Sequence, residues 1–148
     1  MYQRILVAVD GSDTSNHALL EAINLAKDQR ATLRVVSVID EVGIYTGGQV
    51  IDPAPIVESW IKAGREILDK SQKLAYATGI NAETKLIEIE NAGERIEDAI
   101  VEEAQAWHAD LLVTGTHGRS GLKHLLMGSV AEGIVRNSPV PILLIHSK

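Results

Sequence analysis

The feature of the sequence that most constrains the fold is a regular alternation of short apolar runs with longer stretches of helical spacing. Five runs are rich in Val, Ile or Leu, and we expect them to be strands: residues 4–10, 32–39, 83–90, 109–115 and 140–145. Between them, apolar residues recur every three or four positions, which predicts helices over residues 14–27, 57–79, 96–107 and 127–136. This alternation predicts an α/β fold, a single doubly wound, Rossmann-like parallel sheet of five strands with helices on both faces.

The composition of the strands predicts their order in the sheet. The runs 5–9 ("ILVAV") and 111–113 ("LLV") are apolar throughout, as strands covered on both faces are. The run 83–90 ("ETKLIEIE") carries several charges, which is typical of an exposed edge strand. We therefore expect the order 3-2-1-4-5, in which the winding reverses between strands 1 and 4. Ligands of such sheets bind at the carboxyl ends of the strands that flank this reversal, here beside loops 10–15 and 115–129.

Composition narrows the class of protein. The chain has 148 residues, which suits one domain over residues 1–148, and it has no Phe, so the core must be aliphatic. The absence of Cys excludes disulfides, thiolate catalysis and Cys-ligated zinc. A net charge of −6 argues against non-specific binding to nucleic acid. The run "ILVAV" is too short for a signal-peptide core or a membrane span, so we expect a cytoplasmic protein that binds neither nucleic acid nor membrane.

The stretch "GTHGRSGLKHLLMGS" (115–129) has the spacing G-x-x-G, nine residues, then G-S, which is neither the Walker nor the dinucleotide spacing. A glycine loop between a strand and a helix is nevertheless the general plan of a phosphate site, because backbone amides and the helix N-terminus attract anions. Glycine allows a positive φ or a close approach. We interpret Gly115 and Gly118 as shaping the turn, and Gly128 and Ser129 as starting a helix whose amides face the same anion. The alternative is that they are ordinary turn and helix-end residues.

With these residues the chain resembles the universal stress proteins, specifically their ATP-binding branch, whose G-x2-G-x9-G-[ST] motif it matches in full. The resemblance covers the whole chain: "ILVAVDGS" and "VVSVIDE" are similar to the first two strands of the family, and residues 109–145 are similar to its C-terminal third. It implies a stress-response regulatory protein that binds ATP, ADP or AMP, with any Mg²⁺ held by the phosphates, and that forms a homodimer.

The resemblance also implies a set of nucleotide-binding residues. Asp10 lies where the family places an acidic residue near the ribose and phosphates, and Ala8 lines the pocket two residues earlier. The backbone of Val38 meets the adenine, and Thr114 lines the nucleotide. The remaining matches are phosphate and ribose contacts: Gly115, Gly118, Gly128, Ser129 and Val130. In addition, His117 lies in the glycine turn near the expected phosphates, and Arg119 is either a further phosphate contact or a solvated loop residue.

The sequence predicts no catalytic residue and no metal ligand. The histidines do not form a cluster with metal-ligand spacing, and Ser12 and Ser129 lack both a G-x-S-x-G elbow and an evident base. Ser12 is better explained as a helix cap. Glu102 and Glu103 are adjacent on a helix and so do not form a carboxylate pair, and acidic stretches such as 88–91 are interpreted as solvated faces.

We therefore favour a nucleotide-binding regulatory protein with little or no turnover, because a fixed Lys and a Walker Asp are absent and phosphoryl transfer depends on such positioning groups. A second interpretation is a slow Mg²⁺-dependent ATPase or nucleotide hydrolase. A third is an interaction module with a vestigial pocket. An unidentified regulatory partner protein is compatible with the favoured interpretation.

The run 140–145 ("VPILLI") predicts an interface. In the order 3-2-1-4-5 it lies at an edge of the sheet, yet it is apolar on both faces, and exposed apolar edges aggregate unless they are covered. Three residues follow it, too few to cover it. A second copy, paired antiparallel across a two-fold axis, is the simplest cover, and Pro139 and Pro141 would limit its extent. We expect a homodimer through residues 140–145, in agreement with the resemblance.

Replacing Gly118 by Val tests the phosphate-loop interpretation. A branched side chain at this turn would block the approach of a phosphate and would penalise a positive φ. We expect Gly118→Val to abolish nucleotide binding in equilibrium dialysis while the circular dichroism spectrum stays that of the parent. A folded variant with the affinity of the parent would show that the interpretation is wrong.

Overall fold

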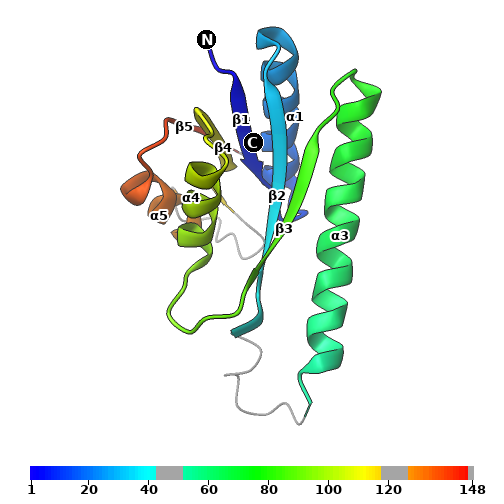
Figure 1. The fold of residues 1–148 in the computed structure, drawn as a ribbon, viewed down its shortest axis with the longest axis vertical. Coiled ribbons are helices and arrows are strands. Elements are labelled where there is room, and N and C mark those ends of the chain that lie inside the picture. The colour runs from blue at the N-terminus through cyan, green and yellow to red at the C-terminus, as the bar shows by residue number, and fades with distance from the viewer. Residues whose placement is uncertain (43–51, 118–126, 147–148) are drawn as a thin grey trace.

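The computed structural model describes residues 1–42, 52–117 and 127–146, and these form one parallel sheet with flanking helices (Figure 1). The strands are β1 (Arg4–Ala8), β2 (Thr32–Asp40), β3 (Glu83–Ile89), β4 (Leu111–Gly115) and β5 (Ile142–Ile145). The helices are α1 (Asp13–Gln29), α3 (Ala54–Ala77), α4 (Ile96–Ala106) and α5 (Ser129–Asn137). All four strand pairings are parallel, and the order β3-β2-β1-β4-β5 confirms the prediction.

Helices cover both faces of the sheet. Figure 1 shows α1 and α3 on one side and α4 and α5 on the other. Alternate residues of the central strands divide between two cores: Val7 and Val113 pack on the side of α1, whereas Leu6 and Leu112 pack on the side of α4 and α5. The continuous apolar runs of β1 and β4 follow from burial on both faces, as predicted.

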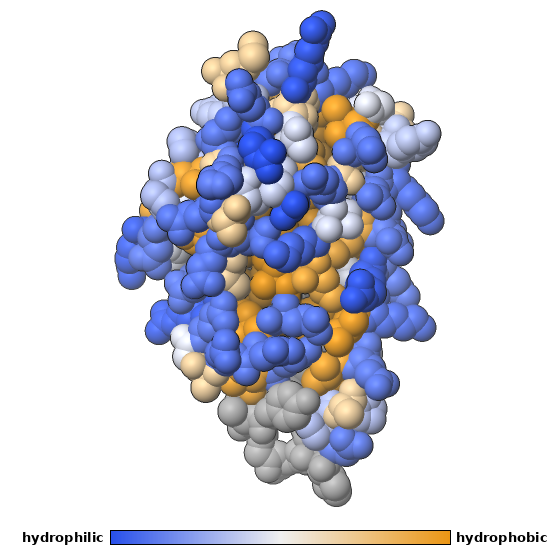
Figure 2. Space-filling model, viewed as in Figure 1, coloured by the Kyte–Doolittle hydropathy of each residue, from blue (hydrophilic) through white to orange (hydrophobic). Residues whose placement is uncertain are grey.

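The two edges of the sheet differ. On β3 the charged residues Glu83, Lys85 and Glu88 are exposed, as predicted for an edge strand, and Figure 2 shows apolar surface between hydrophilic flanks in the middle of this face of the molecule. On β5 all four apolar residues are half-buried. This strand begins at Ile142 rather than at residue 140 because Pro141 has no N–H to donate. The carbonyl of Pro141 still accepts the N–H of Leu112 at 2.9 Å.

Within the described residues, no helix combines the length and apolar character that a membrane crossing requires.

Cation–π contacts and ion pairs connect the C-terminal end of α4 to the sheet. The guanidinium carbons of Arg4 and Arg34 lie 4.2 and 4.9 Å from the centre of the Trp107 ring, at a distance that favours cation–π attraction. Glu103 is buried, and its two carboxylate oxygens bind Arg34 at 2.8 Å and Lys85 at 2.6 Å. Glu102 is exposed, so these adjacent carboxylates do not form a pair, as predicted.

Gly115 allows α1 to pack closely on the end of β4. A Cβ on Gly115 would lie 2.6 Å from Cγ2 of Thr14 and 3.3 Å from its carbonyl carbon, and the Thr14 side chain is buried. The φ angle of Gly115 is not in the left-handed region. Its lack of a side chain is therefore explained by contact with α1 and not by a turn that needs positive φ, which corrects our interpretation of this glycine.

We expect Gly115→Ala to lower the free energy of unfolding by about 1–3 kcal/mol, the usual cost of an added methyl group in a tightly packed core. In a Thr14→Ser background, which removes Cγ2, the same substitution should cost less. Urea denaturation of the four proteins measures both effects. An equal loss in the two backgrounds would contradict the assigned contact.

Candidate functional site

The carboxyl end of β1 leads into α1 through a tight turn. Gly11 has a φ of 83°, a conformation that glycine adopts without strain. The N–H of Ser12 donates to Oδ1 of Asp10 at 2.9 Å, and the hydroxyl of Ser12 caps α1 by accepting the N–H of Ser15 at 3.2 Å. The capping role of Ser12 is thus confirmed, and the carboxylate of Asp10 lies where β1 ends.

Thr116, which follows β4, is joined to the start of α5 by one backbone hydrogen bond and to the end of β5 by another. Its carbonyl accepts the N–H of Gly128 at 2.6 Å, and its own N–H donates to the carbonyl of Ile145 at 2.9 Å. A Cβ on Gly128 would lie 3.3 Å from that same carbonyl oxygen of Thr116. Glycine therefore lets the two segments approach here. We call the group Thr116, His117, Gly128, Ser129 and Val130 the α5 junction.

The N-terminus of α5 presents amides without intrahelical acceptors. Gly128 is the N-cap and has extended backbone angles, and the first helical hydrogen bond runs from the N–H of Glu132 to its carbonyl at 2.9 Å. The N–H groups of Ser129, Val130 and Ala131 precede that bond, so they have no acceptor within the helix. Together with the helix dipole they favour an anion. The start of the helix at Gly128 and Ser129 confirms that part of the prediction.

An apolar surface adjoins the α5 junction on the side of α4 and α5. Ala8, Val38 and Val130 are half-buried and pack against the core of that face. Thr114 follows Leu112 by two residues on β4, so its side chain projects to the same face, and it is buried. Val7 pairs with Val113, which places Ala8 and Thr114 side by side one residue further along. Small and apolar side chains at these strand ends suit a flat, apolar ring system.

The ends of β2 and β3 carry a different electrostatic character. Glu41 is buried directly after β2, and burial raises the pKa of its carboxyl, as do a hydrogen bond with Glu88 and the negative charges of Glu88 and Glu90. Glu88 and Glu90 are exposed, in agreement with their interpretation as solvated, whereas the burial of Glu41 was not predicted. Crowded carboxyl groups here disfavour a phosphate beside them.

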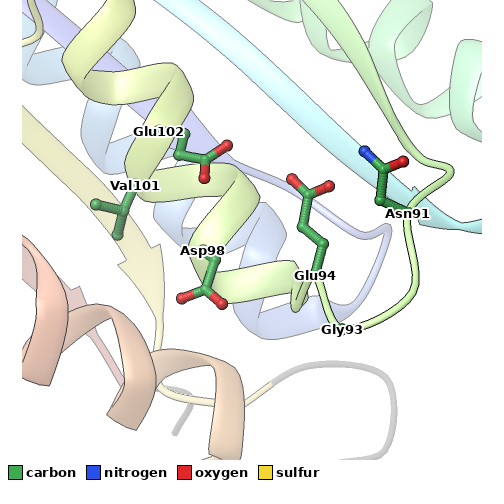
Figure 3. Close-up of a pocket in the computed structure, with 6 residues that line it drawn as sticks. All are labelled: Asn91, Gly93, Glu94, Asp98, Val101 and Glu102. Atoms are coloured by element: carbon green, nitrogen blue, oxygen red, sulfur yellow. The ribbon is translucent and has the colours of Figure 1, made fainter.

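A cavity of about 510 Å³ lies between α4 and the loop that precedes it (Figure 3). Asn91, Gly93 and Glu94 line it from the loop, and Asp98, Val101 and Glu102 line it from α4. Of the predicted binding residues that the structure describes, none lines this cavity. Three carboxylates around one space repel a phosphate, so this cavity is unsuited to an anion, whereas the amides without intrahelical acceptors at the start of α5 favour one.

The structure thus brings most of the predicted residues to one end of the sheet, at the carboxyl ends of β1, β2 and β4 and the start of α5. These are Ala8, Asp10, Val38, Thr114, Gly115, His117, Gly128, Ser129 and Val130. Gly118 and Arg119 lie outside the described residues. Sequence reasoning missed Thr116, which is 1% exposed and joins three segments. Its position in the sequence between the motif residues Gly115 and Gly118 could have indicated that it lies at the site.

Comparisons with known proteins agree with this geometry. The model of the universal stress protein family matches residues 1–146. Universal stress protein MJ0531 of Methanocaldococcus jannaschii is 36% identical over 98% of this chain and 82% of its own length. A universal stress protein structure from Burkholderia pseudomallei is 34% identical, with a TM-score of 0.80 over 97% of this chain and 96% of that one. The universal stress protein of Archaeoglobus fulgidus in complex with dAMP is 26% identical, with a TM-score of 0.68 over 97% and 98%. The sequence match over nearly the whole chain and the shared fold establish that this protein belongs to the universal stress protein family.

Proposed function

We propose that this protein is a stress-response regulatory protein of the ATP-binding branch, in which one domain binds an adenine nucleotide with little or no turnover. The phosphates lie at the α5 junction, and the base lies against the apolar surface of Ala8 and Val38. Asp10 lies near the ribose, at the end of β1.

The observation that carries this proposal is the start of α5 beside the end of β4. Amides of Ser129 and Val130 that have no intrahelical acceptor supply an anion site at the reversal of the sheet, where ligands of doubly wound folds bind. The related protein from Archaeoglobus fulgidus was solved in complex with dAMP, which supports an adenine nucleotide as the ligand whose phosphate binds here. Because the chain as a whole has a net charge of −6, it does not attract an anion over a long distance, and a phosphate must be held by hydrogen-bond donors at short range, such as backbone amides.

Low turnover is supported by the kind of groups that surround the proposed phosphates. The described residues of the α5 junction offer backbone amides, the exposed hydroxyl of Ser129 and one imidazole, all of which are neutral groups that can bind an anion in its ground state. The carboxylate of Asp10 is engaged by the N–H of Ser12 at 2.9 Å. Hydrolysis of a phosphoanhydride needs a positioned water and concentrated positive charge at the transferred group, and these neutral donors supply neither.

Replacing Ser129 by Pro removes one proposed donor without breaking the helix. Ser129 is the first residue of α5, where proline is tolerated, and Gly128 already has the extended φ of −73° and ψ of 165° that a residue before proline adopts. We expect Ser129→Pro to weaken ATP binding, measured by titration calorimetry, by about 10-fold to 100-fold, the effect of losing one hydrogen bond to a charged group.

Ser129→Ala is the matched control, because it removes the hydroxyl and keeps the amide. It should weaken binding less than Ser129→Pro does. Chromatography of the nucleotide after prolonged incubation measures ADP formation. A parent protein that binds no adenine nucleotide would refute the proposed function and favour the interaction module. Steady ADP formation that is lost with Ser129→Pro would favour the hydrolase instead.

We also propose that the protein forms a homodimer through β5. The strand is bonded to β4 along one side, and its other side faces no strand among the described residues. Its four apolar residues remain half-buried in the single chain, so a second copy would bury further apolar surface. An antiparallel pairing across a two-fold axis would leave the two nucleotide sites separate.

Leu144→Lys tests this interface. A charge in the middle of β5 would have to lose water on pairing, so we expect the variant to be monomeric in light scattering at micromolar concentration while the parent is dimeric. Leu74→Lys is the control, because Leu74 is an exposed leucine that lies on α3, away from β5. A monomeric parent, or equal dissociation in both variants, would overturn the proposal.

A further inference from the structure

A groove runs along α4 on the side of β3. It consists of two neighbouring hollows, of about 510 Å³ and about 240 Å³, which share Glu94 and Glu102 in their linings. The second hollow is also lined by residues of β3 and α4: Lys85, Ile87, Ala99, Glu103 and Ala106. The lining residues of α4 run from Asp98 in its first turn to Ala106 at its end, a span of about 12 Å along the helix axis. We call the two hollows together the α4 groove.

Apolar side chains line both hollows of the α4 groove. Val101 lines the first, and Ile87, Ala99 and Ala106 line the second. Ile87 packs against the core of this face but is only half-buried, because β3 is an edge strand and α4 packs over β1, β2 and β4. Figure 2 shows apolar surface in the middle of this face, between hydrophilic flanks. Apolar surface with a polar rim is typical of a site that binds another protein.

Three carboxylates at the α4 groove have no cationic partner among the residues that the structure describes. No ion pair in this part of the chain includes Glu94, Asp98 or Glu102. Figure 3 shows the side chains of Glu94 and Glu102 turned toward each other across the first hollow. Glu103, by contrast, is buried and binds both Arg34 and Lys85. The negative charge of the three carboxylates is therefore not compensated within the described residues.

An occupant of the α4 groove must match both its apolar surface and its charge. An apolar occupant without charges would leave the carboxylates unpaired while it removes water from them, which costs free energy. Lys or Arg side chains that pair with the carboxylates offset this cost and fix the orientation of the occupant. An amphipathic helix presents an apolar stripe with such residues on its flanks, and about two turns of it match the length of about 12 Å.

We propose that the α4 groove binds a basic amphipathic helix of a partner protein. Apolar side chains of that helix pack against Ile87 and Val101, and its Lys or Arg side chains pair with Glu94, Asp98 and Glu102. This specifies a surface and a chemistry for the regulatory partner that the sequence left unidentified. The inference does not depend on the proposed function, because none of these five residues belongs to the proposed nucleotide site.

The probe is a synthetic peptide of about 14 residues, built from alanine, leucine and lysine so that leucines form one stripe of a helix and lysines flank it. Fluorescence anisotropy measures its binding to the full-length protein. We expect the triple variant Glu94→Gln, Asp98→Asn and Glu102→Gln to weaken binding by about 10-fold, the combined effect of three charge pairs at the rim of an interface.

A second triple variant, Glu21→Gln, Asp28→Asn and Glu66→Gln, is the matched control. It changes the net charge by the same amount, but at exposed positions of α1 and α3, which cover the opposite face of the sheet. We expect it to bind the peptide within about twofold of the parent, because salt screens distant charges. An equal loss in the two triple variants would show that the peptide responds only to the total charge, and would overturn the proposal.

Two further peptides separate the apolar contribution from the electrostatic one. A peptide with serine in place of leucine should bind at least about 10-fold more weakly, because it buries no apolar side chains. A peptide with glutamate in place of lysine should not bind. The proposal is wrong if the parent does not bind the leucine and lysine peptide, or if the serine peptide binds equally well. Spermidine that displaces the peptide and loses affinity in the groove variant would assign the groove to a small cation instead.

Discussion

The hydrogen bond from the N–H of Gly128 to the carbonyl of Thr116 is the contact on which the proposed site depends. At 2.6 Å it holds the N-cap of α5 against the residue that follows β4. Because the other backbone bond of Thr116 reaches Ile145 at the end of β5, the start of the helix is fixed relative to two strands at once. A helix N-terminus attracts an anion wherever it lies, but here it is held at the reversal of the sheet, beside Ala8 and Thr114.

Electrostatics separate this end of the sheet into two regions. Beside β2 and β3, Glu41 is buried near Glu88 and Glu90, and the cavity next to α4 is lined by three more carboxylates. The α5 junction has amides and an imidazole instead. A nucleotide with its phosphates at α5 avoids the carboxyl groups, and its base can still reach the apolar surface of Ala8 and Val38. The acidic character of the whole chain therefore does not oppose an anionic ligand at this position.

The order of the strands could be predicted from the sequence because burial on two faces makes β1 and β4 apolar throughout, whereas exposure makes β3 charged. The start of α5 followed from Gly128 and Ser129. The function of Gly115 could not be predicted, since the side chain that it accommodates, Thr14, lies far away in the sequence. Thr116 was missed for a related reason: its burial and its contacts come from three segments that meet only in the fold. The strand β5 begins at Ile142 and not at residue 140 as expected, because Pro141 has no N–H to donate.

Amide chemical shifts measured while AMP, ADP and ATP are added to nitrogen-15-labelled protein test the central claim most directly, because they show where each part of the nucleotide lies. The account predicts that the changes include Ser129 and Val130, that these grow from AMP to ATP as phosphates are added, and that Ala8 and Val38 respond equally to all three. Changes centred on Asn91, Glu94 and Asp98, with Ser129 and Val130 unaffected, would place the ligand in the acidic cavity and would contradict it.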